Sequence, residues 1–266
     1  MTSRESEPLP KNSSFLVNPR SIRTVLSNPG LILDYLTLRR RLSRFLQVSE
    51  SSLRLWQREL YTSKLPAQLM NNWQRLVRGS ISKYSGGATL GPANEVLYLM
   101  IRALRPSVVL ETGTAAGFST AFMLQALKDN REGDLFSISL HDMIDTGYPD
   151  QRGQVDLIRT LTTPRIGDVI PSGLRGRWHL TEGKTQTELE PLLRRIGPIG
   201  MFFRDDDHKA ELMHWEFSAV WDRLSEDGLL VSDDVDWNGS YREFCEERGL
   251  ETFSWFGRGA ASRSDL

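Results

Sequence analysis

Short apolar segments alternate with amphipathic segments of helical spacing from about residue 91 to residue 256 of this 266-residue chain. Strands are predicted at six places: 108–111, 134–140, 177–181, 199–203, 229–232 and 251–256. Helices are predicted before and between most of them, at 91–105, 118–128, 187–196, 208–224 and 239–248. Such alternation is typical of parallel strands with helices on both faces of the sheet. The pattern therefore predicts an α/β fold with a doubly wound, mostly parallel sheet.

The first third of the chain has a helical pattern instead. Residues 1–14 are polar and charged and are predicted to form a disordered tail. Over residues 15–84 apolar side chains recur at helical spacing, and Pro66 interrupts the pattern. A glycine-rich break at 85–87 separates this helical extension from the domain predicted for residues 85–266. Because its apolar stripes need a partner, we expect the extension to cover a binding pocket or to form a dimer interface.

The composition excludes several classes of protein. The chain has 33 basic and 34 acidic residues and a formal net charge of −1, which argues against a nucleic-acid partner. Its single cysteine, Cys245, excludes a disulfide framework and a multi-cysteine zinc site. No apolar run is long enough for a bilayer, and the first residues carry no signal-peptide pattern. We therefore expect a cytoplasmic protein with no membrane partner.

The sharpest local motif, ETGTAAGFS from Glu111 to Ser119, follows the first predicted strand. A strand that ends at an acid, a loop of small residues and a helix start form the corner at which open parallel sheets bind ligands. Small residues let the backbone approach a ligand, and N–H groups at a helix start attract anions. Gly113 and Gly117 are four residues apart, unlike the dinucleotide pattern G-x-G-x-x-G. The alternative interpretation is an ordinary tight turn.

Acidic residues follow two further predicted strands. One cluster comes after residues 199–203 and the other after residues 229–232, and together they comprise Asp205, Asp206, Asp207, Asp233 and Asp234. If the two strands are neighbours, both clusters lie at one edge of the sheet, where like charges repel unless a cation or a proton is shared. Magnesium takes a few carboxylates plus water. We therefore predict a divalent-metal site; the alternative is a set of solvent-facing helix caps.

Taken in order, the segments Glu111–Gly117, Phe203–His208 and Leu230–Asp234 resemble class I S-adenosylmethionine-dependent methyltransferases. The resemblance covers about residues 89–256 and is greatest to methyltransferase family 24 and to the related metal-dependent, macrocin-type O-methyltransferases. It implies a Rossmann-like α/β fold, S-adenosyl-L-methionine as cofactor, and Mg²⁺ or another divalent cation.

The resemblance implies that Glu111, Gly113 and Gly117 hold the methionine part of the cofactor. Family members usually end the second strand with an acid for the ribose hydroxyls, whereas this chain has Ser139 there and Asp142 three residues later. A serine cannot accept two charge-assisted hydrogen bonds as a carboxylate does. The other predicted cofactor contacts are Thr114, Ser119 and Gly183.

The resemblance also implies that Asp205, Asp233 and Asp234 are the metal ligands. Asp205 and His208 are the predicted catalytic residues, and His208 matches a histidine that could orient a ligand or the substrate hydroxyl. A cation would lower the pKa of the acceptor hydroxyl while the pocket aligns it with the methyl group. No covalent intermediate is needed, which agrees with the lack of a nucleophile motif.

The C-terminal residues depart from the family pattern. The family's sheet usually ends in an antiparallel hairpin, but residues 257–266 are rich in Gly, Ala, Ser and Arg and make a poor last strand. We therefore predict a shortened sheet or a disordered tail. Together with Ser139, this leaves a non-catalytic binding protein of the same fold as an alternative, and a nicotinamide-dependent oxidoreductase as a less favoured one.

Our leading prediction is a metal-dependent O-methyltransferase that acts on a small-molecule hydroxyl. A homodimer is the assembly that we consider for it. The acceptor cannot be identified from the sequence, because the helical extension and residues 141–174 show no readable chemistry.

Overall fold

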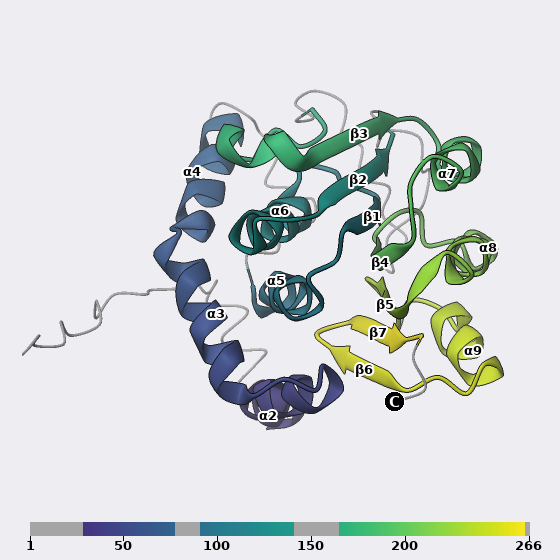
Figure 1. The fold of residues 1–266 in the computed structure, drawn as a ribbon, viewed down its shortest axis with the longest axis horizontal. Helices are drawn as coiled ribbons and strands as arrows, with labels where there is room; N and C mark the ends of the chain where they lie inside the picture. The colour runs from purple at the N-terminus through teal and green to yellow at the C-terminus, as the bar shows by residue number, and fades with distance from the viewer. Residues whose placement is uncertain (1–28, 78–90, 141–164, 264–266) are drawn as a thin grey trace, which may run out of the picture.

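The computed structural model describes residues 29–77, 91–140 and 165–263. Within these residues one sheet has the strand order β3-β2-β1-β4-β5-β7-β6 (Figure 1). Its strands are β1 (Val108–Thr112), β2 (Asp134–Ser139), β3 (Trp178–Glu182), β4 (Ile199–Arg204), β5 (Leu224–Ser232), β6 (Thr252–Trp255) and β7 (Arg258–Ser262). The first five pair in parallel, and β7 pairs antiparallel with β5 and β6. The predicted doubly wound, mostly parallel sheet is confirmed.

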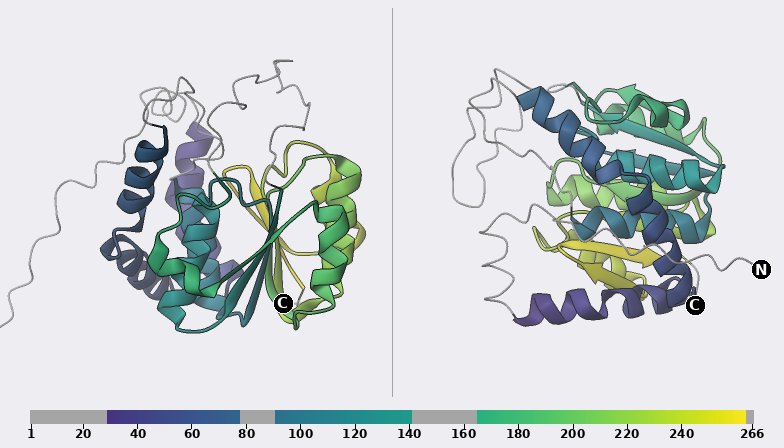
Figure 2. Two further views of the ribbon diagram at one scale, coloured as in Figure 1. Left: turned by 90° about the horizontal axis from the view of Figure 1, so that it is seen from above. Right: turned by 90° about the vertical axis from the view of Figure 1, so that its left-hand side faces the viewer.

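Helices cover both faces of this sheet, as the two further views show (Figure 2). One face is covered by α5 (Pro92–Leu104) and α6 (Phe118–Asn130), with α3 (Glu50–Thr62) and α4 (Leu65–Val77) outside them and α2 (Pro29–Phe45) against β6. The other face is covered by α7 (Thr185–Leu193), α8 (Ala210–Trp221) and α9 (Ser240–Glu247). A short 3₁₀ helix, η2 (Ser172–Arg177), precedes β3. None of the described helices is both long and apolar enough to cross a membrane.

The helical extension is confirmed for residues 29–77 and shares a core with the sheet. Its buried leucines belong to the same apolar cluster as the inner faces of α5 and α6, and they are Leu42, Leu53, Leu60, Leu65 and Leu69. Trp73 on α4 packs edge-on against Phe118 at the start of α6, with 5.7 Å between ring centroids. Phe45 on α2 stacks on Phe253 of β6 at 5.3 Å. The predicted tail and residues 78–90 lie outside the described residues.

The C-terminal strand that the sequence analysis rejected is present. β7 lies between β5 and β6, and all of its residues are buried. A side chain on Gly259 would begin with a Cβ atom 2.6 Å from the ring of Tyr241 on α9, so only glycine fits beneath that ring. The prediction of a shortened sheet or disordered tail is therefore wrong for residues 258–262. Close packing against Tyr241 outweighs the low strand propensity of small residues here.

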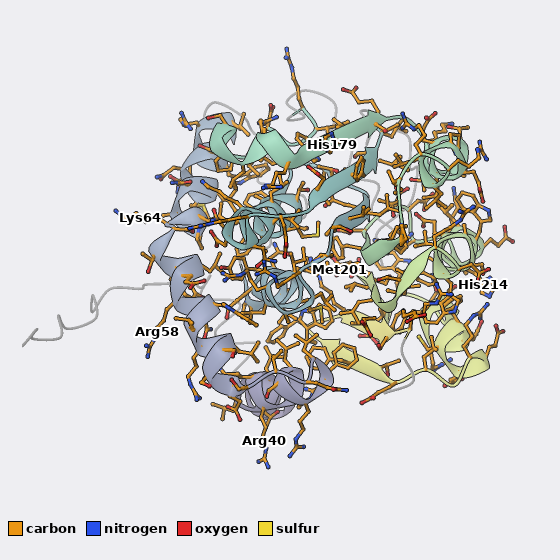
Figure 3. The ribbon with its side chains drawn as sticks, viewed as in Figure 1. Arg40, Arg58, Lys64, His179, Met201 and His214 are labelled. Atoms are coloured by element: carbon orange, nitrogen blue, oxygen red, sulfur yellow. The ribbon has the colours of Figure 1, made fainter. Side chains whose placement is uncertain are left out.

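The predicted helix at 208–224 is also too long. Helix α8 ends at Trp221, and β5 already begins at Leu224. Pairing between β4 and β5 shifts register between Ile199 and Met201, which accommodates this earlier start. Met201 itself lies within the core of the sheet (Figure 3).

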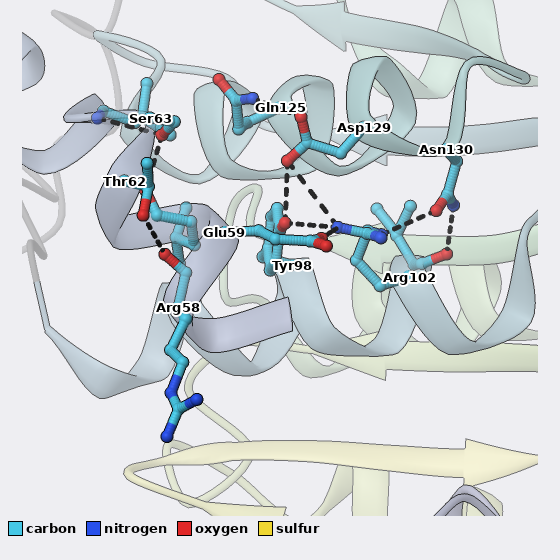
Figure 4. Close-up of polar contacts among 12 residues, drawn as sticks. Arg58, Glu59, Thr62, Ser63, Tyr98, Arg102, Gln125, Asp129 and Asn130 are labelled. Carbon is cyan, nitrogen blue, oxygen red and sulfur yellow. Dashed lines mark hydrogen bonds and ion pairs between the residues drawn. The ribbon is translucent and has the colours of Figure 1, made fainter. Parts of the chain in front are cut away.

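A polar network fastens the extension to the domain (Figure 4). Arg102 on α5 donates to the side-chain oxygen of Asn130 at 2.8 Å and to the Tyr98 hydroxyl at 2.7 Å. It also forms an ion pair with Glu59 of α3, and its guanidinium lies 5.6 Å from the centroid of the Trp56 ring. One largely buried arginine thus joins α3, α5 and α6.

We expect Arg102→Ala to lower the free energy of unfolding by about 2 kcal/mol, because it removes charge-assisted hydrogen bonds from a largely buried site. Urea denaturation measures this loss. Arg58→Ala is the matched control, since Arg58 on α3 is exposed and points away from the network (Figure 4). Equal stability of the two variants would show that the network does not hold the extension.

Candidate active site

The loop after β1 packs directly on the loop after β4. The Asp205 N–H donates to the Thr112 carbonyl at 2.7 Å, and the Gly113 N–H donates to the Ile138 carbonyl at 2.9 Å. Gly113 has φ +85°, and a Cβ atom there would lie 1.9 Å from the Asp205 carbonyl oxygen. Only glycine permits this approach. The predicted cofactor loop and the predicted first metal ligand therefore share one corner of the sheet.

Gly117 is also required by the protein's own packing. It has φ +95° at the start of α6, and a Cβ atom would lie 2.6 Å from Cγ1 of Ile170. The N–H groups of Gly167 and Val169 donate to the carbonyls of Ala115 and Ala116 at 2.9 and 3.1 Å. The segment around residues 167–170 thus packs against the loop after β1 and stabilises its conformation.

Glu111 lies beneath the loop and is fully buried. Its carboxyl accepts hydrogen bonds from the hydroxyls of Thr114 at 3.0 Å, Thr120 at 2.8 Å and Ser137 at 2.6 Å. Burial raises the pKa of Glu111 to about 7, and the three hydroxyl donors oppose that shift. In this structure Glu111 therefore organises the loop from below, and its predicted contact with the cofactor stays a prediction.

Ser139 and Gly183 link the loop to the ends of β2 and β3. The Thr114 N–H donates to the Ser139 hydroxyl at 3.2 Å, and the Gly183 N–H donates to the Ser139 carbonyl at 3.1 Å. Ser119 is buried in the first turn of α6. Asp142, the other predicted ribose contact, lies outside the described residues.

We expect the buried carboxyl of Glu111 to make stability fall as pH rises. Its pKa is about 7 in the folded protein and 4.5 as the ordinary value, so the folded state binds the extra proton between these limits. The stability present below pH 4.5 is lost as pH rises to about 7, by up to roughly 3 kcal/mol. Urea denaturation across this range should show a shallower decline for Glu111→Gln. Burial also raises the pKa of Glu216 to about 7, so Glu216 contributes to the same decline, and only the difference between Glu111→Gln and wild type reports on Glu111. Parallel curves of stability against pH for the two proteins would contradict the raised pKa of Glu111.

The predicted metal ligands follow the carboxyl ends of β4 and β5. The Asp233 N–H donates to the Arg204 carbonyl at 2.8 Å, which places Asp233 beside Asp205. Burial raises the pKa of Asp205 well above its ordinary range, and the neighbouring Asp233 adds to the shift. No described residue donates a hydrogen bond to the Asp205 carboxyl. The charges of Arg258 and Arg204 act in the opposite direction and lower the pKa of Asp205 in part.

Asp233 and Asp234 have protein partners. Arg258 on β7 donates two parallel hydrogen bonds to the Asp233 carboxylate, Nε to Oδ1 at 3.0 Å and Nη2 to Oδ2 at 3.1 Å. The Nε2 atom of His208 lies 3.0 Å from Oδ2 of Asp234, and this hydrogen bond lowers the pKa of Asp234. In the described part of the chain, no three His, Cys, Asp or Glu side chains are grouped as a ready metal site.

The remaining described histidines lie away from this corner. His179 on β3 stacks on Phe136, and His214 on α8 lies against the edge of Phe244 (Figure 3). A hollow of about 370 Å³ lies at the β3 edge of the sheet. It contains no predicted site residue, and its lining is Arg165, Ile166, Asp168, Arg175, Trp178, Leu180 and Glu182.

Comparison with known proteins agrees with this geometry. Residues 110–235 match the sequence model of methyltransferase family 24, which is described as a methyltransferase domain. This span begins in β1 and ends just after Asp234, so it contains the loop and both acidic clusters. The chain carries a methyltransferase domain. The methyltransferase predicted from the sequence is thereby confirmed.

Solved structures share the fold of this methyltransferase at low identity. An O-methyltransferase from Bacillus cereus in complex with SAH has 14% identity and a TM-score of 0.51, with 74% of this chain and 90% of that chain covered. The SAH-bound methyltransferase PaMTH1 from Podospora anserina has 14% identity and a TM-score of 0.52, with 75% and 88% covered. The SAM-bound O-methyltransferase TomG from Streptomyces achromogenes has 17% identity and a TM-score of 0.50, with 74% and 89% covered. No curated protein matches the chain significantly.

Sequence reasoning missed two arginines of the methyltransferase site. Arg204 is the last residue of β4, wholly buried, and Arg258 opens β7, the strand that was rejected. Arg204 lies in the segment Phe203–His208, directly before three acidic residues, so the sequence did contain a signal for its role. Arg258 gave no local signal, because its partner Asp233 is 25 residues away.

We expect Arg258→Ala to lower the free energy of unfolding of the methyltransferase by about 3 kcal/mol, because it removes the two hydrogen bonds to the Asp233 carboxylate and the one to the side-chain oxygen of the buried Asn94. Thermal or urea denaturation measures the change. Arg242→Ala removes an exposed arginine with a loose Glu246 contact and serves as the control. A loss below 0.5 kcal/mol, roughly the range of neutral surface changes, would show that Arg258 does not stabilise the site.

Proposed function

We propose that this methyltransferase transfers a methyl group from S-adenosyl-L-methionine to a hydroxyl of a small molecule. The observation that carries the proposal is the contact between the loop at Gly113 and the backbone of Asp205. It joins the predicted cofactor loop to a cluster of carboxylates within one corner. Methyl transfer needs the sulfonium and the acceptor oxygen held in line at such a corner.

The cofactor assignment is supported by the loop and by the bound ligands of structures with the same fold. The first turn of α6 begins at Gly117 and leaves backbone N–H groups near the loop, a favourable place for a carboxylate. Glu111 and Ser139 hold the loop from beneath by hydrogen bonds to Thr114. The named complexes of similar fold contain SAH or SAM.

The donor set supports a hard divalent cation such as Mg²⁺. Asp205, Asp233 and Asp234 would hold it through oxygen atoms, the ligands that Mg²⁺ prefers. No described residue donates a hydrogen bond to the Asp205 carboxyl, and its pKa is raised first by burial and then by the neighbouring carboxylates of Asp233 and Asp234. Asp233 and Asp234 would have to offer the lone pairs that Arg258 and His208 leave unused. When bound, the cation would supply Lewis-acid polarisation of the acceptor hydroxyl.

The residues of the chain then have defined tasks in the transfer. When bound, S-adenosyl-L-methionine would supply the methyl group: its C–S bond would break as the bond to the acceptor oxygen forms, and a neutral thioether would remain. The hydroxyl proton passes to a carboxylate of the site, and Asp205 is the carboxylate with spare capacity to take it. Arg258 keeps Asp233 in place throughout, because both of its contacts are within hydrogen-bond distance.

The alternative of a non-catalytic binding protein loses one of its two supports, since the last strand is present. The match to a methyltransferase domain likewise disfavours an oxidoreductase. The small-molecule acceptor, the homodimer and the cytoplasmic location stay predictions.

We expect Asp205→Asn to slow methyl transfer about 100-fold, because it removes a charge from the reacting corner, while the affinity for S-adenosylmethionine stays within about threefold. Mass spectrometry of products from a panel of hydroxylated small molecules measures transfer, and calorimetry measures affinity. Asp227→Asn makes the same charge change at the exposed far end of β5 and is the control. Excess chelator should slow the wild-type protein, and added Mg²⁺ should restore it.

Methyl transfer that continues unchanged in excess chelator would contradict only the proposed dependence on a metal ion. Unchanged transfer by Asp205→Asn would contradict the assignment of the reacting corner.

A further inference from the structure

His208 stands in a chain of polar contacts that runs from α8 to the end of β5. Nε of Arg204 donates to Oε2 of Glu216 at 3.0 Å, and both side chains are wholly buried. Nη1 of Arg204 lies 3.0 Å from Nδ1 of His208. Nε2 of His208 lies 3.0 Å from Oδ2 of Asp234. The chain therefore ends on a carboxylate of the proposed reacting corner.

The chemistry of arginine decides where the hydrogen on His208 lies. A guanidinium has five N–H donors and no acceptor, and it stays charged in proteins. Nδ1 of His208 must therefore accept from Arg204, which leaves the ring hydrogen on Nε2. That hydrogen points at Oδ2 of Asp234, an acceptor. Both ring nitrogens are then engaged by protein partners.

We infer that His208 is a positioning residue: Arg204 orients its ring so that Nε2–H donates to Oδ2 of Asp234 and holds that carboxylate in place. The Oδ1 atom of Asp234 remains for a ligand, and the Asp234 side chain is 48% exposed. The role of that ligand rests on the proposed function. The direction of the two hydrogen bonds, from Arg204 to His208 and from His208 to Asp234, does not. In this arrangement His208 neither contacts the acceptor hydroxyl nor receives its proton.

Glu216 is what keeps Arg204 aimed at His208. A wholly buried guanidinium requires a carboxylate partner, and Glu216 supplies it on the Nε side. Nη2 of Arg204 donates to the Asp207 carbonyl, so two directions of the planar fork are occupied by Glu216 and Asp207. The remaining direction that matters here is Nη1, and it meets Nδ1 of His208.

The backbone around Asp234 and His208 is also fixed. Asp234 has φ +49°, in the left-handed region that aspartate tolerates better than most other side chains. Its N–H donates to Oδ1 of Asp233 at 3.1 Å. The Asn238 amide donates to the His208 carbonyl at 2.9 Å, and the Trp237 ring lies 5.2 Å from the His208 ring. These contacts hold His208 and Asp234 in position for their hydrogen bond.

The hydrogen-bond order can be read directly by long-range ¹H–¹⁵N NMR of the ¹⁵N-labelled full chain, without any acceptor. The chain has four histidines, so the His208 signals are assigned by their loss in His208→Gln. We expect a neutral ring with hydrogen on Nε2 and an accepting Nδ1. A ring protonated on Nδ1, or on both nitrogens, at neutral pH would overturn the inference.

A pair of variants separates positioning from proton transfer. The glutamine amide in His208→Gln can still donate to Asp234 but cannot take a proton, whereas His208→Ala does neither. We expect methyl transfer within about threefold of wild type for His208→Gln and at least about tenfold slower for His208→Ala, the effect of one charge-assisted hydrogen bond.

Equal, large losses in both variants would assign His208 a proton-transfer role and overturn the inference. If His208→Ala fails to fold by circular dichroism, retention of activity by His208→Gln still supports positioning and its loss still contradicts it. If wild type transfers no methyl group to any acceptor, the proposed function fails, and the NMR result still decides the hydrogen-bond order.

Discussion

The close approach of two backbone loops at Gly113 and Asp205 is the constraint on which the site depends. β1 and β4 are parallel neighbours at the centre of the sheet, so their carboxyl ends emerge side by side. A Cβ atom at Gly113 would collide with the Asp205 carbonyl, which makes glycine obligatory there. From the sequence, the small residues of this loop indicate space for a ligand. In the structure, Gly113 is needed first for the packing of the loop against the backbone of Asp205. Substitution of Gly113 would disturb Asp205 as well as any cofactor.

Charge balance is the second constraint, because several acids are gathered where the sheet ends. Arg258 neutralises Asp233, and Arg204 neutralises Glu216 in the interior. Asp234 is held by the neutral donor that we infer on His208. Asp205 alone lacks a donor among the described residues, and burial together with Asp233 raises its pKa. A carboxyl in these surroundings favours a bound cation or a proton.

Much of this arrangement could be predicted from the sequence because it is local. Apolar runs followed by acids located β1, β4 and β5, and alternation with helices predicted parallel pairing at one edge. β7 could not be predicted, since its small residues have low strand propensity and the strand is held by pairing with β5 and β6, with Gly259 packed under the ring of Tyr241. Its Arg258 was missed for the same reason: the ion pair with Asp233 exists only after strands distant in sequence become neighbours. Glu111 was found, but its hydroxyl partners come from three separate segments and could not be read from the motif, and its cofactor contact stays a prediction.

The central claim, that the corner between β1 and β4 binds S-adenosylmethionine, is tested most directly by NMR titration of the full chain with S-adenosylhomocysteine. The account predicts one molecule bound per chain, with amide shifts concentrated at residues 113–119 and at Asp205. Shifts confined to the hollow at the β3 edge, or no binding at millimolar ligand, would contradict it.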